Sequence, residues 1–393
     1  AGYPMDFELW YLILVPLLFA AGWFARSFDI KEKQTIANEK DTLYKGVDLL
    51  LSKKQDQAID AFINLVKLDP DTVEMHFSLA GLFRRRGEFD RAIKIHNVLV
   101  NREDLPKKIR SRALYELGED YLKAGLWDRA EECFLKLSDT SESYKTIARK
   151  ELLHIYETEK EWQKAIDEAN IIQRQSGEDQ STRIAQLYCE LTQQNLYFKN
   201  FKGAAEALEK ALKVDPNNKR ALIIKGKMLK AKGDIDGALA TWKQVGQISP
   251  VYGTLVVEQI ASLLLEAGRK EEAVKYLEDL FKDGSTTDEV DTAGILLGKA
   301  GNSKEAITLI QEHLKTQPTL VAFYRLIDLR LANEPENESL KQLHGLLKNM
   351  LSKAVRYKCT KCGFATRKFL WRCPGCHQWE TFPPVRQENL SGK

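Results

Sequence analysis

The sequence predicts an all-α protein built as an array of helix pairs, with a transmembrane helix before the array and a small metal-binding domain after it. Three observations carry this prediction. Residues 9–25 form an uncharged apolar run, and a motif with a period near 34 residues recurs through the middle of the chain. Four of the six cysteines lie in two C-x-x-C pairs near the C-terminal end.

The composition is that of a folded protein in a reducing compartment. Of its 393 residues, 44% are hydrophobic and 29% are charged, and the 59 basic and 56 acidic residues give a net charge of +3. This balance argues against a general polyanion binder, which needs a basic excess to neutralise phosphates. Outside the tail, the sequence holds only Cys133 and Cys189, and both are interpreted as buried small apolar residues rather than nucleophiles.

The apolar run LWYLILVPLLFAAGWFA at residues 9–25 predicts a membrane anchor. At ~1.5 Å per residue it reaches about 25 Å, which is close to the thickness of a bilayer core. Asp6 and Glu8 precede the run and basic residues follow it from Arg26, so we expect the N-terminus outside and the rest of the chain in the cytoplasm. A cleaved signal peptide, which would begin with basic residues, and an interfacial helix are the alternatives.

A repeat dominates the middle of the chain. Its clearest copy, residues 220–250, contains a small residue at Gly226, a turn at Gly233 and a second helix that begins near Ile235. An alanine recurs where the two helices are expected to cross, because only a small side chain fits between closely packed helices. These alanines are Ala58, Ala92, Ala130, Ala165, Ala204, Ala238, Ala273 and Ala306.

Two further positions define the repeat. Glycine is expected to form the turn five residues before the alanine, at Gly87, Gly125, Gly233, Gly268 and Gly301. Lysine replaces it at Lys53, Lys160 and Lys199, which is expected to weaken those units. A bulky side chain three residues before the alanine is expected to fill the helix pair, at Phe89, Trp127, Trp162, Phe201 and Ile235.

Over about 280 positions this pattern resembles the tetratricopeptide repeat. The resemblance implies a right-handed superhelix with a concave groove for a peptide or a partner helix. The repeat register places seven candidate partner-binding residues on the groove: Arg84, Arg85, Arg112, Glu119, Lys123, His154 and Glu157. The alternative is that they are ordinary solvated surface charges.

The two cysteine pairs, in CTKCG and CPGC, predict a closed site for one metal ion. The expected ligands are Cys359, Cys362, Cys373 and Cys376. Iron and zinc both suit four thiolates, so the metal stays open. The segment resembles rubredoxin with two departures: the ten residues between the pairs are fewer than in a full rubredoxin, and His377 stands where the second loop would have glycine.

Three roles suit this metal domain. It could carry electrons, or it could bind nucleic acid through Phe369, Trp371 and the basic residues around them. The domain holds more aromatic side chains than about thirty residues can bury, which favours a third role as a clasp docked on the last repeats. Known catalytic motifs such as G-x-S-x-G and H-E-x-x-H are absent from the sequence, so we expect no enzyme and assign no catalytic residue.

The order of parts resembles the LapB family of inner-membrane proteins of Gram-negative bacteria. The strings that carry the resemblance are GLFRRRGEFDRAIKIH (81–96), DYLKAGLWDRAEE (120–132), EWQKAID (161–167) and YKCTKCGFATRKFLWRCPGC (357–376). The resemblance implies an adaptor that restrains lipopolysaccharide synthesis by promoting proteolysis of the deacetylase LpxC by the protease FtsH. It also implies a membrane partner that senses lipopolysaccharide and contact with inner-membrane lipid, with no nucleic acid expected. Homo-oligomerisation stays open.

These interpretations divide the chain into six segments. They are a cloning remnant (1–4), a transmembrane anchor (5–28), a juxtamembrane linker (29–41), about nine tetratricopeptide-like helix pairs (42–352), a rubredoxin-like metal-binding domain (355–386) and a tail (387–393). The ninth pair, residues 319–352, follows from pattern alone.

Overall fold

The structure is a computed structural model that describes residues 73–281, 286–353 and 357–383, together with Trp23 and Arg26. The predictions for the remnant, the linker, the first alanine at Ala58 and the tail lie outside the described residues, as does nearly all of the anchor. Among the described residues, no helix has the length and apolar character needed to cross a membrane.

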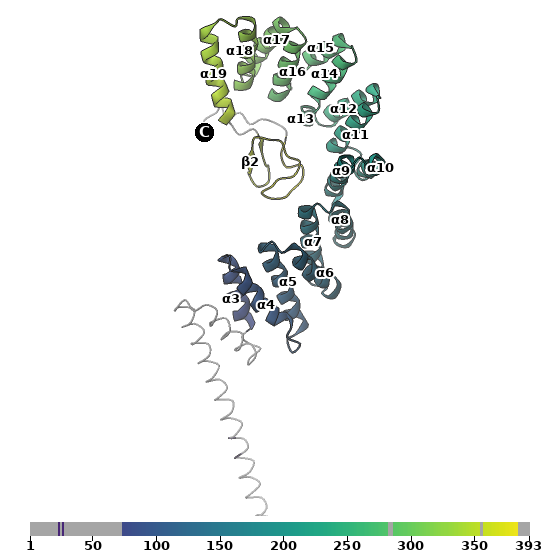
Figure 1. Cartoon of the computed structure of the whole chain (residues 1–393), viewed down its shortest axis with the longest axis vertical. Helices are drawn as coiled ribbons and strands as arrows, with labels where there is room; N and C mark the ends of the chain where they lie inside the picture. The colour runs from purple at the N-terminus through teal and green to yellow at the C-terminus, as the bar shows by residue number, and fades with distance from the viewer. Residues whose placement is uncertain (1–22, 24–25, 27–72, 282–285, 354–356, 384–393) are drawn as a thin grey trace, which may run out of the picture. The chain divides into compact units, whose positions relative to one another are not determined.

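The chain divides into two compact units, at Glu159 and Lys160. The described part of the first unit contains consecutive helices that pack on one another (Figure 1). These helices are α3 (Val73–Arg85), α4 (Phe89–Val100), α5 (Lys107–Lys123), α6 (Trp127–Thr140) and α7 (Lys145–Glu159).

The second unit continues the helix pairs and ends in the cysteine-rich segment (Figure 1). Its helices are α8 (Trp162–Ser176), α9 (Ser181–Tyr197), α10 (Phe201–Val214), α11 (Lys219–Ala231), α12 (Ile235–Ile248), α13 (Pro250–Gly253), α14 (Val257–Glu266), α15 (Lys270–Asp279), α16 (Thr287–Lys299), α17 (Ser303–Thr316), α18 (Leu320–Asn333) and α19 (Glu338–Lys353). The antiparallel strands β1 (Tyr357–Lys358) and β2 (Ala365–Thr366) follow. Helices α18 and α19 form a helix pair at the place expected for residues 319–352.

The repeated alanine occupies the interior of the helix array, as expected. All seven described copies, from Ala92 to Ala306, are completely buried. In the copy at residues 220–250, Trp242 is 1% exposed, and its indole N–H donates to the carbonyl of Ile223 at 3.1 Å. A Cβ atom on Gly226 would lie 2.2 Å from the Trp242 Nε1 atom, which explains why glycine stands there.

Seven turns between paired helices use a left-handed residue, whether or not it is glycine. Gly87, Gly125, Gly233, Gly268 and Gly301 all have positive φ, as the repeat pattern predicts. Lys160 and Lys199 adopt the same conformation, with φ of 62° and 59°. A left-handed residue with a Cβ atom costs roughly 1–2 kcal/mol, so lysine preserves the turn and strains it.

One expectation about the bulky position is wrong. Trp162 is 9% exposed, as a side chain that fills a helix pair should be, but Phe201 is 66% exposed. The turn before Phe201 presents Tyr197 and Phe198 to solvent as well, with exposures of 82% and 69%. Three aromatic side chains are therefore exposed within five residues of one another at this corner.

Candidate metal centre and its docking on the helix pairs

The two cysteine loops repeat one hydrogen-bonding pattern. In the first loop, the N–H of Gly363 donates to the carbonyl of Cys359 at 3.0 Å, next to the short β1–β2 pairing. In the second, the N–H of His377 donates to the carbonyl of Cys373 at 2.8 Å. Each tight turn brings the two sulfurs of its C-x-x-C pair to the same side.

His377 departs from the rubredoxin pattern in sequence but not in conformation. Its φ is 57°, close to the 76° of Gly363 at the equivalent position of the first loop. The second loop therefore keeps its geometry at the cost of a strained residue. The N–H of Gly375 also points at the sulfur of Cys373, with 3.4 Å between the two atoms.

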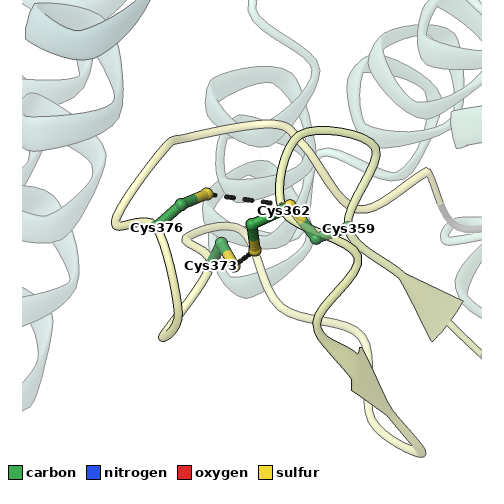
Figure 2. A group of neighbouring side chains, drawn as sticks. All are labelled: Cys359, Cys362, Cys373 and Cys376. Carbon is green, nitrogen blue, oxygen red and sulfur yellow. Dashed lines mark hydrogen bonds between the residues drawn. The ribbon is translucent and has the colours of Figure 1, made fainter.

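The four predicted ligands come together at one point (Figure 2). All four sulfur atoms lie within 4.8 Å of one another. The Sγ atoms of Cys359 and Cys376 are 3.8 Å apart, and those of Cys362 and Cys373 are 3.5 Å apart. Metal–sulfur bonds of about 2.3 Å in a tetrahedron place sulfurs about 3.8 Å apart, whereas a disulfide requires about 2.05 Å. The site fits one ion held by four thiolates.

The surroundings of Cys359 favour the thiolate that a metal ligand must be. Burial raises the pKa of this thiol, but hydrogen bonds from the hydroxyl of Thr381 and the backbone N–H groups of Cys362 and Lys361 outweigh burial and lower the pKa to about 6. The Oγ1 atom of Thr381 lies 3.3 Å from the Cys359 sulfur. Both zinc and iron bind such a site, so its chemistry does not select between them.

The two remaining cysteines behave as expected of buried apolar residues. Cys189 is completely buried and Cys133 is 6% exposed. Burial raises the pKa of Cys189 to about 12 and that of Cys133 to about 11. Neither thiol is ionised near neutral pH, and this argues against a nucleophilic role.

An ionic contact joins the metal domain to the helix pairs. The carboxylate of Glu380 accepts a hydrogen bond from the side chain of Gln186 on α9, at 2.7 Å. Its other oxygen lies 3.1 Å from the Nζ atom of Lys219, the first residue of α11. Gln186 also accepts from the guanidinium of Arg220 at 3.2 Å, and Arg220 pairs with Glu190 at 2.9 Å. Glu380 therefore connects two helices through a single carboxylate.

Aromatic side chains cover the same contact. Trp371 stacks on Tyr252 of α13, with ring centroids 5.7 Å apart and planes 17° apart, and Phe369 meets the same tyrosine edge-on at 6.4 Å. The guanidinium of Arg220 lies 5.8 Å from the ring of Trp371 and 5.9 Å from that of Trp379. Aromatic pairs of this kind contribute about 0.5–1.5 kcal/mol beyond their buried area.

The structure therefore confirms that surplus aromatic side chains dock on the repeats, but it corrects where they dock. The contacts are with α9, α11 and α13 rather than with the last helix pairs. Gln186, Lys219, Arg220 and Glu380 are part of this interface and were not identified from the sequence. Isolated polar residues carry no local signal of a partner that is 161 or 194 positions away.

Two of the seven candidate groove residues, Arg84 and Arg112, form ion pairs with neighbouring helices. Arg84 contacts the carboxylates of Glu116 at 2.5 Å and Asp120 at 3.2 Å. Arg112 pairs with Glu74 at 2.6 Å, and burial raises the pKa of Glu119.

The remaining four candidates differ in exposure. Arg85 and Lys123 are exposed and His154 is half-buried. Glu157 is only 2% exposed, which removes it from the accessible set. Partner binding by the other six candidates stays a prediction.

Comparisons with known proteins follow the same division of the chain. The family model described as the rubredoxin metal binding domain matches residues 357–384, and the tetratricopeptide repeat model matches residues 53–103 and 196–245. A tetratricopeptide repeat protein from Parabacteroides merdae has 16% identity, covers 71% of this chain and 100% of its own, and gives a TM-score of 0.32. The chain is an all-helical tetratricopeptide-repeat protein with a C-terminal rubredoxin-like metal-binding domain.

Relatives match over nearly the whole length. Lipopolysaccharide assembly protein B of Escherichia coli strain K12 is 35% identical over 386 residues, which cover 96% of this chain and 98% of the relative. The protein of the same name from Haemophilus influenzae is 30% identical, with 97% and 99% covered. The chain belongs to the lipopolysaccharide assembly protein B family.

Proposed function

We propose that this protein is an adaptor, rather than an enzyme, that regulates lipopolysaccharide biosynthesis. The observation that carries this proposal is the match to relatives named lipopolysaccharide assembly protein B over 96% of the chain, helix pairs and metal domain together. Tetratricopeptide arrays present extended surfaces to other proteins, which supports an adaptor role.

The proposal in its finer form is that the adaptor promotes FtsH-dependent proteolysis of the LpxC deacetylase. An anchor formed by residues 5–28, with the N-terminus in the periplasm, would hold the helix pairs at the cytoplasmic face of the inner membrane. Confinement beside a membrane protease raises the effective concentration of the adaptor without any new contact. A membrane partner that senses lipopolysaccharide would relieve this action.

The metal domain contributes as a clasp. Its ion would be held by Cys359, Cys362, Cys373 and Cys376, and would supply the cross-link that keeps the two loops in one shape. The docked face then holds α9, α11 and α13 at fixed positions through Glu380, Trp371 and Phe369. A nucleic-acid ribbon needs such rings free for stacking, and Trp371 is already stacked on Tyr252.

The half-life of LpxC in bacteria tests the proposal. A Gram-negative strain lacking its own member of this family would receive the full chain, the chain without residues 5–28, or the Cys359→Ser variant. After protein synthesis is stopped, we expect LpxC to disappear quickest with the full chain and to persist when FtsH is inactive. Membrane fractionation of the same cells would test the anchor.

Two results would count against the proposal. If LpxC has the same half-life with and without the full chain, the proteolytic role is wrong. If the Cys359→Ser variant folds and accumulates normally yet restores the full rate, the clasp is not needed. Metal analysis with a reduction titration would separate the clasp from electron transfer, since a zinc-loaded site is redox-silent.

A further inference from the structure

A surface groove lies between α10 and α11, away from the metal centre. It has a volume of about 490 Å³ and opens to solvent. Leu208 and Leu212 of α10 and Met228 and Leu229 of α11 form its apolar floor. Three of these four side chains are only half-buried, so the floor is apolar surface that the fold leaves accessible.

The rim of the groove is basic. Lys213, Lys225 and Lys232 line it, and all three are exposed. Glu209 is the acidic side chain among the lining residues, which leaves an excess of two positive charges on the rim, from three lysines and one glutamate. An apolar floor flanked by lysines is complementary to a ligand with an apolar stripe and acidic flanks.

Phe201 extends the apolar floor toward the corner of the array. Phe201, Ala205, Leu208 and Leu212 are spaced by four, three and four residues, which puts them on one face of α10. The exposure of Phe201, 66%, is unexplained by packing within its own helix pair. It becomes a contact residue if a ligand lies along this face.

The groove and the metal domain occupy different sides of α11. At about 100° per residue, Lys225, Met228, Leu229 and Lys232 cluster on one face, and Arg220 lies about 130° around the helix from the middle of that face. Arg220 contacts Trp371 and Trp379 of the metal domain. The groove therefore stays accessible while the metal domain is docked.

We propose that this groove binds an acidic amphipathic helix of a partner protein. The ligand places apolar side chains, at i, i+3, i+4 and i+7, on Leu208, Leu212 and Met228, and its flanking carboxylates face the three lysines. The residues that line this surface include none of the seven candidate groove residues and none of three residues that contact the metal domain, Gln186, Lys219 and Tyr252. Binding at this surface requires neither FtsH nor LpxC. The proposal can therefore be tested independently of the function proposed above.

The test uses the metal-loaded protein and a fluorescein-labelled synthetic peptide of about four helical turns with leucine at the helix-face positions and glutamate on both flanks. One control peptide replaces every glutamate with lysine, and the second replaces every leucine with serine. We expect saturable binding of the acidic peptide by fluorescence anisotropy, and binding at least about tenfold weaker for each control.

Protein variants locate the site. The triple variant Lys213→Glu/Lys225→Glu/Lys232→Glu should lose at least about tenfold in affinity for the acidic peptide and gain affinity for the lysine peptide. Phe201→Ser should weaken binding with the charge preference unchanged. Lys210→Glu/Lys227→Glu changes exposed lysines of the same two helices outside the groove lining and should bind as the unmodified protein does. Circular dichroism verifies that each variant is folded.

Three results would overturn the proposal. They are no binding of the acidic peptide, an equal loss of affinity in the Lys210→Glu/Lys227→Glu control, and an unchanged affinity in the folded triple variant. Anionic vesicles of phosphatidylglycerol and phosphatidylcholine provide the lipid arm. Binding of these vesicles that depends on Phe201 and the three lysines, without binding of the peptide, would assign the surface to lipid instead.

Discussion

Glu380 of the metal domain and Lys219 of α11 form an ion pair of 3.1 Å across 161 residues of sequence. Their side chains are 13% and 23% exposed, so the pair is partly shielded from solvent. The contact connects the metal site to the middle of the array, because Glu380 lies four residues after Cys376 and Lys219 begins a helix whose next five residues, 220–224, are buried.

The ion pair should be measurable as a coupling. Glu380→Ala and Lys219→Ala should each lower the free energy of unfolding of the second unit, and a double-mutant cycle should give a coupling of about 1 kcal/mol. Chemical denaturation of the four proteins gives this value. Lys227→Ala, on the exposed part of the same helix, is the matched control and should show no coupling with Glu380→Ala. A coupling energy of zero in this cycle would mean that the contact does not stabilise docking.

Removal of the metal should destabilise the helix pairs as well as the small domain. Without the ion, the two loops lose their cross-link and the docked face of Trp371 and Glu380 loses its support. If docking contributes about 2 kcal/mol, the unfolding midpoint of the second unit falls by roughly 4–8 °C in Cys359→Ser or Cys373→Ser. Calorimetry and metal analysis check this together.

Cys133→Ala provides the control for the cysteine variants. It truncates a buried thiol outside the metal site, so it should leave the metal content unchanged. An unaltered melting curve for a metal-free Cys359→Ser protein would contradict a structural role for the clasp.

Two glycine substitutions should change stability in opposite directions. Gly226→Ala places a Cβ atom 2.2 Å from the indole nitrogen of Trp242, and overpacking of this kind costs about 1–3 kcal/mol. Gly81→Ala, inside α3, meets nothing within 4 Å and should stabilise the protein by up to about 1 kcal/mol, since alanine favours helix. Thermal unfolding of both variants tests the comparison, and a neutral Gly226→Ala would mean that Trp242 can shift.

Replacing a lysine in a left-handed turn by glycine should stabilise the protein. Lys199→Gly removes a Cβ atom from a residue with φ of 59° and should raise the free energy of unfolding by about 1 kcal/mol. The reverse change, Gly233→Ala, puts a Cβ atom on a residue with φ of 83° and should lower it by a similar amount. Urea denaturation measures both. If Lys199→Gly were destabilising, the lysine side chain would have to hold the turn by contacts of its own.

A carboxyl of α7 should make stability in the first unit depend on pH. Burial and the nearby Glu119 raise the pKa of Glu151 above its ordinary 4.5. The folded state therefore holds the proton more tightly than the unfolded state, so this group's stabilising contribution is present below pH 4.5 and is lost as pH rises through the folded pKa. Glu151→Gln should be more stable than the unmodified protein at pH 7, and the difference should shrink near pH 4.

That comparison needs a control and has a clear contrary result. Glu132→Gln changes an exposed carboxyl of α6 and should show no comparable gain at pH 7. Denaturation at several pH values gives the profile for each protein. A Glu151→Gln variant that is less stable at pH 7 would show that Lys123, which lowers the pKa of Glu151, dominates its surroundings.

Much of the fold followed from patterns within a few tens of residues. The alanines predict helix crossings because backbones that approach closely exclude larger side chains, and Ala130 and Ala238 are indeed completely buried. The cysteine spacing predicts the metal site because two tight turns bring four sulfurs together. Both signals depend only on residues close together in the sequence, so they can be recognised without knowledge of the tertiary structure.

Other features depended on which surfaces meet. The exposure of Phe201 could not be predicted, because the same spacing in another repeat gives the nearly buried Trp162. Arg84 forms ion pairs with two carboxylates that lie 32 and 36 residues away in the sequence. The residues next to Phe201 and Arg84 in the sequence give no signal of either arrangement.

The sequence alone determined the helix pairs, their turns and the four metal ligands, since each rests on sterics or bond geometry within one short segment. Only the tertiary structure decided that the metal domain docks on α9, α11 and α13 rather than on the last helix pairs. That choice depends on Tyr252, Arg220 and Lys219 presenting one surface that matches Trp371 and Glu380. Complementarity between distant surfaces arises only when the chain has folded.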